Sequence, residues 1–138
     1  MGCDIHIAVE KKIDGEWVMV HTPTWQRDAA CERNYRRFAA LADVRGDGPP
    51  AKGLPVDVSK GTECKFTAWR EDAHSPSYNS LREFLDICER TKYDDIDHSK
   101  WDISGLCEHY LGLYRELINK NPDDFRVVYW FDNLYADF

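Results

Sequence analysis

The sequence predicts a small α+β domain, in which a mainly antiparallel sheet is covered by about three helices. Strand patterns at the beginning of the chain, a strongly apolar strand pattern near its end and helical patterns between them lead to this fold class. The chain of 138 residues is 43% apolar and 13% aromatic, which is enough apolar surface for one hydrophobic core. We therefore expect residues 1–138 to form a single domain.

Several segments have the residue patterns of strands. Residues 4–10 alternate between apolar and other side chains, and residues 16–20 have strand composition. The Asp14-Gly15 pair between them therefore predicts an N-terminal hairpin. Residues 125–131 are almost all β-branched or aromatic, which is typical of a strand that is covered on both faces near the centre of a sheet. We also expect a strand over residues 64–69.

Helical patterns occupy the middle of the chain. Residues 34–42 have apolar side chains at helical spacing after an asparagine suited to the N-cap, and residues 80–91 open with a capping box. The longest helix is expected over residues 103–118, whose apolar side chains form a continuous stripe. Residues 46–61 hold many of the prolines and glycines, so they predict a long irregular loop inside the domain.

Composition excludes several classes of protein. The net charge is −7, and residues 81–138 carry 13 acidic against 7 basic side chains, so broad nonspecific binding to nucleic acid is not expected. No apolar run approaches the roughly 18 residues of a membrane span. The five cysteines are an odd number without a C-x-x-C pair and without a preceding signal peptide, which predicts reduced thiols in a cytoplasm.

The first candidate site is a set of metal ligands. Asp4 and His6 are two residues apart on the first expected strand, so they share one face, and Asp132 follows the last expected strand. With His74 they would form a mixed nitrogen and oxygen site, which suits zinc, manganese or iron better than calcium. Two other interpretations stay open: a polar face in solvent, and a buried hydrogen-bond network that only fixes the strand register.

The second candidate site is basic. Arg33, Arg36 and Arg37 surround the start of the first expected helix, and Arg45 follows its end. Arginine binds phosphate and carboxylate groups through two parallel hydrogen bonds, so a small anionic ligand such as a nucleotide could bind there. The alternative is a set of solvated helix charges that pair with neighbouring acidic residues.

The opening residues Met1-Gly-Cys-Asp-Ile-His6 resemble the start of small, poorly characterised proteins of bacteriophages and prophages. The similarity continues along nearly the whole chain. Its further segments are Arg33-Asn-Tyr35, Phe38-Ala39, Leu41-Ala42, Val44-Arg-Gly46, Gly53-Leu-Pro55, Asp57, Ser59, His74-Ser75, Ser77 and Arg126-Val-Val-Tyr-Trp-Phe-Asp-Asn133.

The resemblance implies that the opening strand, His74, Asp132 and the segment Arg33, Asn34 and Tyr35 with Arg45 belong to one shared surface, and that the protein acts in a host cytoplasm. Two positions depart from the pattern of these proteins. A second histidine is expected at the position of Pro76, and an aliphatic residue at the position of Arg37. If the missing histidine were a ligand, metal binding by this chain would be impaired or rebuilt.

Two hypotheses for function follow. The first is a small phage-encoded, metal-dependent hydrolase, in particular a phosphoesterase on a nucleotide-like substrate. The predicted ligands would hold the ion that activates water, and Arg33, Arg45 or both would hold the anionic group. The second is a non-catalytic phage accessory protein that inhibits a host defence component or sequesters its nucleotide signal. Its acidic carboxyl-terminal part could then meet a basic surface of the host protein.

Overall fold

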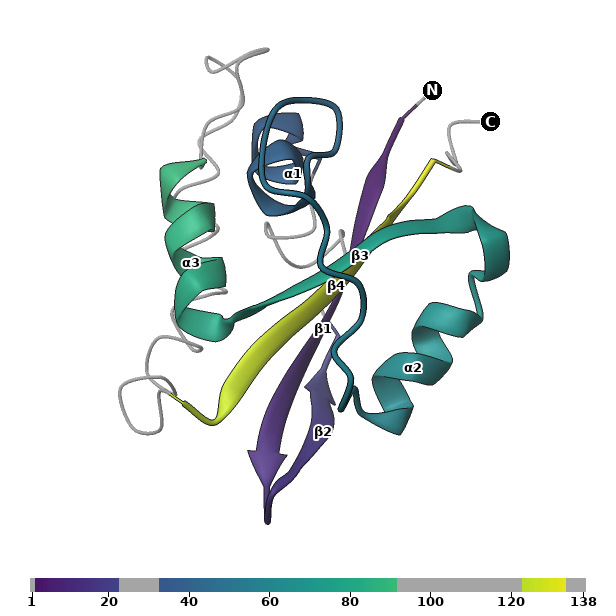
Figure 1. Ribbon diagram of the computed structural model, residues 1–138, viewed down its shortest axis with the longest axis vertical. Helices are drawn as coiled ribbons and strands as arrows, with labels where there is room; N and C mark the ends of the chain where they lie inside the picture. Colours follow the sequence, from purple (N-terminus) through teal and green to yellow (C-terminus); the bar gives the residue numbers. More distant parts are fainter. Residues whose placement is uncertain (1, 23–32, 92–122, 134–138) are drawn as a thin grey trace.

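The computed structural model describes residues 2–22, 33–91 and 123–133 (Figure 1). The elements are, in chain order, β1 (Asp4–Ile13), β2 (Glu16–His21), α1 (Tyr35–Ala42), α2 (Lys60–Thr67), the 3₁₀ turn η2 (Arg70–Asp72), β3 (Ala73–Ser80), α3 (Leu81–Arg90) and β4 (Phe125–Asp132). The four described strands form one antiparallel sheet in the order β2-β1-β4-β3. The predicted α+β class is confirmed. The helix expected over residues 103–118 lies outside the described residues.

The hairpin between β1 and β2 turns where the sequence predicts it. The pairing of the strands ends at the Ile13 and Glu16 pair, which leaves a loop of two residues, Asp14 and Gly15. Their φ angles are +52° and +83°. Positive φ at both positions is the mark of a type I′ turn, whose twist matches that of the flanking strands.

Strand β4 lies in the centre of the sheet. It pairs with β1 on one side and with β3 on the other, and all eight of its residues are buried. This confirms the prediction of a central strand covered on both faces. Its last residue, Asp132, pairs with Asp4 of β1 and with Ala73 of β3, so three strands meet at this end of the sheet.

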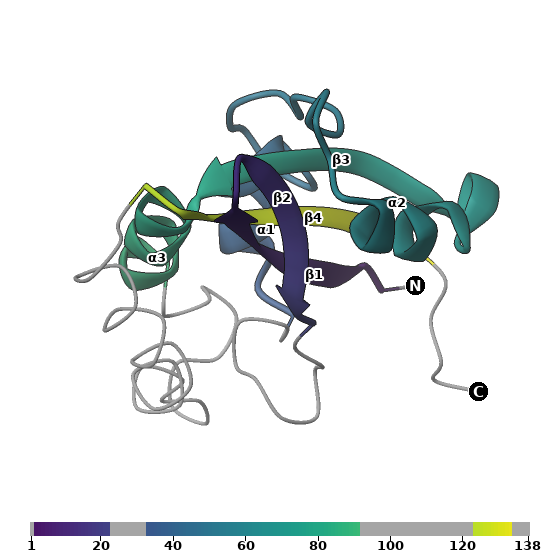
Figure 2. The ribbon, with the colours of Figure 1, turned by 90° about the horizontal axis from the view of Figure 1, so that it is seen from below.

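Helices cover both faces of the sheet. In Figure 1, α1 and α3 lie on one side of the strands and α2 on the other, and in Figure 2 α3 and α2 lie at opposite sides of the view. On the α2 face, Phe66 packs edge to face against Trp130 of β4, with 5.5 Å between the ring centroids. On the other face lies the hydrophobic core, which includes Ile5, Ile7, Val9, Phe38, Leu41, Phe84, Leu85, Val127, Tyr129 and Phe131.

The ends of α1 and α3 follow the predicted signals. The Asn34 side chain accepts a hydrogen bond from the backbone N–H of Arg37, and the Ser80 hydroxyl accepts one from the backbone N–H of Glu83. Both are N-cap hydrogen bonds of the expected kind. Thr91 is the C-cap of α3. In the part of the chain that the structure describes, no helix is both long and apolar enough to cross a membrane.

The strand expected over residues 64–69 is wrong, because this segment lies mostly in α2. Ser59 caps this helix by accepting a hydrogen bond from the backbone N–H of Thr62. The strand that forms in this part of the chain is β3. The loop between α1 and α2 covers its outer edge. There Gly53 donates its backbone N–H to the Pro76 carbonyl, with 2.8 Å between nitrogen and oxygen.

Candidate functional site

The end of the sheet where β1 begins and β4 ends brings together three of the four predicted metal ligands. Directly paired residues of antiparallel strands share a face, so the pairing of Asp4 with Asp132 places both on the α2 face. His6 lies two residues further along β1 on the same face. His6 Nε2 and Asp132 Oδ2 form a hydrogen bond between residues 126 positions apart in the sequence.

Asp132 is 2% exposed, yet only one of its carboxylate oxygens has a partner within the described residues. Oδ2 contacts His6, whereas Oδ1 is buried without a hydrogen bond, as is Nε1 of the neighbouring Trp130. Buried polar atoms in proteins nearly always have a partner, and an unpaired one calls for an explanation such as a water molecule or an ion. Oδ1 is an acceptor on an acidic group, so it is suited to a cation or a water molecule.

Aromatic rings surround His6. The Trp69 ring lies 4.2 Å from the imidazole, centroid to centroid, at an angle of 38°. Trp130 stacks at 6.1 Å. The imidazole keeps an exposed fraction of 28%, whereas the Asp132 side chain keeps 3%. The histidine is therefore the member of the pair that a ligand can reach, and Asp132 is the member that orients it.

Arg33 lies beside this pair and binds Asp4. Its Nε donates to Asp4 Oδ1 at 2.7 Å and its Nη2 to Asp4 Oδ2 at 3.3 Å, which is the two-pronged geometry of an arginine with a carboxylate. Both side chains are more than a third exposed. The guanidinium also lies close to Gly2, where an added Cβ would come within 2.2 Å of Arg33 Cζ. Glycine at this position therefore allows the approach.

The thiol of Cys3 is influenced by both the acidic and the basic residues. Burial raises the pKa of Cys3 to about 11, and the charges of Asp132 and Asp4 act in the same direction, whereas those of Arg45 and Arg33 oppose it. All four charged groups therefore lie within electrostatic reach of one buried sulfur. The arginine cluster and the acidic residues belong to the same end of the sheet.

Tyr35 and Arg45 complete the basic side of the site. The Tyr35 hydroxyl accepts a hydrogen bond from the backbone N–H of Cys3 at 3.4 Å, and the Arg45 guanidinium lies over the Tyr35 ring at 5.0 Å. Arg45 has a φ of +56°, which is uncommon for a residue other than glycine. Such backbone conformations are frequent at functional sites.

Asn34 and Arg37 are fully buried and hold the helices together. Asn34 donates a side-chain hydrogen bond to the Thr91 carbonyl, and Arg37 donates to Thr91 Oγ1 at 3.1 Å and to the Cys88 carbonyl at 3.3 Å. Both residues are 0% exposed. Asn34, which the sequence analysis placed in the ligand-binding set, thus has a structural position. Arg37, where an aliphatic residue was expected, supplies donors to the last turn of α3.

His74 lies on the opposite face of the sheet from the other predicted ligands. It pairs with Phe131, a core residue, and the two rings stack with 6.1 Å between their centroids. Its Nδ1 is 3.0 Å from Ser75 Oγ, and its Nε2 is buried without a described partner. The four-ligand set is therefore not brought together on one face. No group of three or more His, Cys, Asp or Glu side chains among the described residues is arranged to hold a metal ion.

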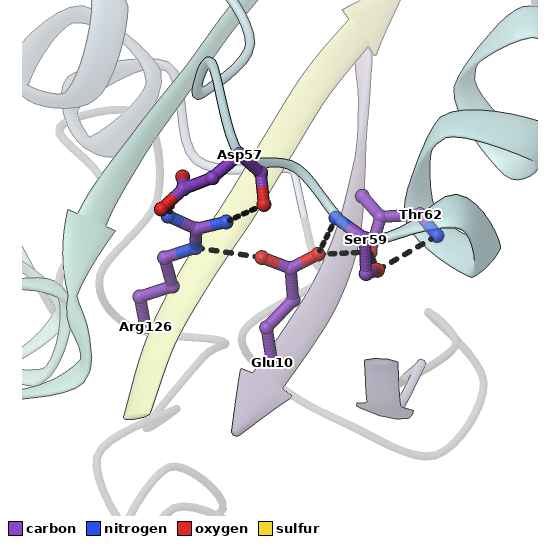
Figure 3. A network of polar contacts seen from close by, with 5 residues as sticks. All are labelled: Glu10, Asp57, Ser59, Thr62 and Arg126. Carbon is purple, nitrogen blue, oxygen red and sulfur yellow. Dashed lines mark hydrogen bonds and ion pairs between the residues drawn. The ribbon is translucent and has the colours of Figure 1, made fainter. Parts of the chain in front are cut away.

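A polar network on the α2 face was not predicted as a unit (Figure 3). Arg126 Nε donates to Glu10 Oε1 at 2.6 Å, while Glu10 Oε2 accepts from Ser59 N at 3.0 Å and from Thr62 Oγ1 at 2.7 Å. Arg126 also binds Asp57 Oδ1 at 2.8 Å. The available signal was the alternation of β1, which places Glu10 on the same face as Asp4 and His6.

The charge of Glu10 in this network is balanced by hydrogen bonds to both of its carboxylate oxygens. Burial alone would raise the pKa of Glu10, but the hydrogen bonds from Ser59, Thr62 and Arg126 outweigh it, so the pKa lies below its ordinary value of 4.5. The hydrogen bond from Arg126 also lowers the pKa of Asp57. Both oxygens of Glu10 have partners, so the network fastens α2 to the sheet and is less suited to bind a ligand than Asp132.

Most of the predicted site residues thus lie at one end of the sheet. No protein-family model matches the chain, and no match is found among the curated proteins or the solved structures. The geometry of this end of the sheet is therefore the main basis for a functional proposal. The residues gathered there are Asp4, His6, Arg33, Tyr35, Arg45 and Asp132.

Proposed function

We propose that this chain is a small metal-dependent hydrolase, in particular a phosphoesterase on a nucleotide-like substrate. The observation that carries the proposal is the pairing of Asp4 directly with Asp132, with His6 beside them on the same face. Carboxylates in this cross-strand position have Cβ atoms about 4.5–5.5 Å apart and repel one another. Arg33 already offsets part of that repulsion at Asp4, and a cation next to Asp132 would offset more of it.

Two of the predicted ligands, His6 and Asp132, are of the kinds that a divalent transition metal takes, and Asp4 would join them only after it leaves Arg33. His6 supplies an imidazole and Asp132 a carboxylate whose Oδ1 is buried without a described partner, and such mixed ligands suit zinc, manganese or iron. The bound ion would lower the pKa of a water molecule and so supply a hydroxide nucleophile. To share one ion, His6 and Asp132 would exchange their hydrogen bond for bonds to the ion. The aromatic rings of Trp69 and Trp130 keep bulk water from one side of the imidazole.

Arg33, which contacts Asp4, would supply the charge that holds a phosphate, and Arg45 over the Tyr35 ring would add to the positive charge at this end of the sheet. A phosphate oxygen competes with Asp4 for the donors of Arg33, because the same Nε and Nη2 atoms bind both kinds of anion. When the phosphate takes these donors, the Asp4 carboxylate is released on the face that carries His6. Substrate binding and completion of the ligand set would then be coupled.

The experiment measures metal content and hydrolysis together. Protein purified without a metal-affinity tag is subjected to elemental analysis and tested on nucleoside monophosphates with zinc, manganese or iron. We expect about one metal ion per chain, with loss of both metal and hydrolysis in His6→Ala and Asp132→Asn. His21→Ala on β2, an exposed histidine away from the site, is the matched control. Unchanged metal content and hydrolysis in His6→Ala would contradict the proposal.

Two other results identify the alternatives. Absence of metal together with tight binding of a nucleotide or of a host protein would favour the phage accessory protein that inhibits a defence component or sequesters its signal. Coupled destabilisation of His6→Ala and Asp132→Asn, without loss of metal or of any binding, would show that the pair only fixes the strand register. The similarity of the opening segment to phage proteins supports a host cytoplasm as the place of action in either case.

A further inference from the structure

Trp69 forms a wall of the proposed site. It follows α2, and its ring lies 4.2 Å from the His6 imidazole. At this distance the two rings are in direct contact, so no third ring fits between them. Trp69 is half-buried, so part of its side chain remains accessible to a ligand.

The backbone around Trp69 fixes the position of the ring. The Trp69 N–H donates to the Phe66 carbonyl, and the Trp69 carbonyl accepts from the Asp72 N–H, each at 3.1 Å. The next residue, Arg70, has a φ of +53°, so the chain turns sharply at this point. A large aromatic side chain at a fixed turn, next to the residue that a ligand can reach, is suited to bind a flat apolar group at low entropic cost.

We propose that Trp69 stacks on the base of the substrate, so that the site takes nucleoside phosphates in preference to phosphate esters without a base. The inference rests on the proposed function, since the phosphate would lie at Arg33 and the scissile bond at His6. Every nucleobase has a flat face and can stack on tryptophan, whichever hydrogen-bond donors and acceptors its edge carries. The wall therefore selects for the presence of a base and does not choose among bases.

The experiment compares ligands with and without a base by calorimetry at a fixed metal concentration. The ligands are AMP, GMP, CMP and UMP against ribose 5-phosphate, and hydrolysis of each is measured in parallel. In Trp69→Ala we expect the affinity for the nucleoside monophosphates to fall by about 5- to 150-fold. The affinity for ribose 5-phosphate should stay unchanged. Trp69→Phe keeps an aromatic ring and should retain most of the affinity for nucleotides.

Two controls separate stacking from damage to the fold. Trp69→Leu keeps apolar volume without a π face, so it should lose the preference for nucleotides even if Trp69→Ala fails to fold. Trp17→Phe changes a tryptophan that lies over Arg126 at 4.1 Å, near the hairpin, and should leave all affinities unchanged.

The outcomes distinguish the two proposals. If wild type binds and hydrolyses ribose 5-phosphate as well as AMP, and Trp69→Leu does the same, the role of Trp69 in base binding is overturned while the phosphoesterase proposal stands. If wild type neither binds nor hydrolyses any of these ligands with any of the three metals, both proposals are overturned.

Discussion

At the scale of single residues, Cys3 shows how burial and charge act on one group at the site. Its thiol is 0% exposed, although it lies near two arginines that favour the thiolate. The effect of burial on the pKa is the larger one, because moving a thiolate out of water costs more free energy than the attraction of the partly solvated arginines provides. A cysteine next to a proposed catalytic centre is thus unsuited to serve as the nucleophile.

This balance predicts slow chemistry at Cys3. At pH 8, iodoacetamide should modify the exposed Cys64 while Cys3 and the buried Cys88 stay unmodified, because the pKa of Cys3 is about 11 and thiolates are the reactive species. Peptide mapping by mass spectrometry after a time course checks this, and urea-unfolded protein provides the reference in which all three react. Modification of Cys3 at the rate of Cys64 would contradict the burial described here.

Residues of the site were predictable where face alternation is enough to place them. Asp4 and His6 lie two apart on a regular strand, and Asp132 ends a strand whose composition was unmistakable. His74 was not predictable, because its strand has few β-formers and its pairing shifts between His74 and Ser77. A shift of one residue moves a side chain to the opposite face, so no pattern in the sequence could assign the face of His74.

At the scale of elements, α2 depends on a fixed connection to the sheet. The connection is Glu10, which is 0% exposed and receives hydrogen bonds from the N-cap of α2 and from Arg126 of the neighbouring strand. Phe66, which packs on Trp130, belongs to the same helix, and Trp69 follows directly. The Glu10 network therefore supports the aromatic wall of the site from a distance.

The charge of Glu10 predicts how stability depends on pH. Its pKa is lower in the folded than in the unfolded chain, so its contribution is fully present above about pH 4.5 and is lost as the pH falls through the lowered pKa. Glu10→Gln should reduce the free energy of unfolding by about 3 kcal/mol at pH 7, since Arg126 loses its buried partner, and should flatten the decline in stability below pH 5. Urea unfolding between pH 7 and pH 3 measures both effects.

The control for this prediction is Glu71→Gln, which changes an exposed glutamate of η2 and should shift the free energy of unfolding by less than about 0.5 kcal/mol. An equally steep loss of stability at low pH in wild type and Glu10→Gln would contradict the assigned role of Glu10.

The elements themselves were predictable in proportion to the strength of their local signals. The hairpin has an Asp-Gly turn, α1 and α3 have N-caps, and β4 is continuously apolar, so local sequence determines each of them. The segment of α2 alternates Cys64 and Phe66 in the manner of a strand, and the cap at Ser59 was the opposing signal. Strand β3 forms because its backbone pairs with β4 and its edge is covered by the loop at Gly53, and neither interaction leaves a local pattern.

For the whole molecule, the acidic side chains outnumber the basic ones, but two arginines lie together at the site end of the sheet. The chain carries a net charge of −7, whereas Arg33 and Arg45 gather at the site end of the sheet. A small phosphate ligand can reach these arginines, while a long polyanion also meets the acidic remainder within a Debye length of about 10 Å.

This distribution predicts discrimination between small and polymeric anions. Random-sequence duplex DNA should bind weakly, with little dependence of the affinity on salt between about 0.05 and 0.2 M, because few phosphates would be neutralised. Fluorescence anisotropy with a labelled duplex measures this, and a basic DNA-binding protein of similar size is the positive control. A steep salt dependence, as for several phosphate contacts, would contradict the prediction.

The central place of β4 also sets the order in which the molecule can be assembled during synthesis. Strands β1 and β3 have no pairing with each other except through β4, and β4 is the last strand of the described chain to be made. Until it is released from the ribosome, the hairpin and the β3-α3 unit lack the strand that joins them. Asp132 arrives with the final residues of that strand, so a nascent or truncated chain that lacks it has neither a complete sheet nor the proposed site. Any activity of the proposed site would therefore require β4 to have paired with both of its neighbours.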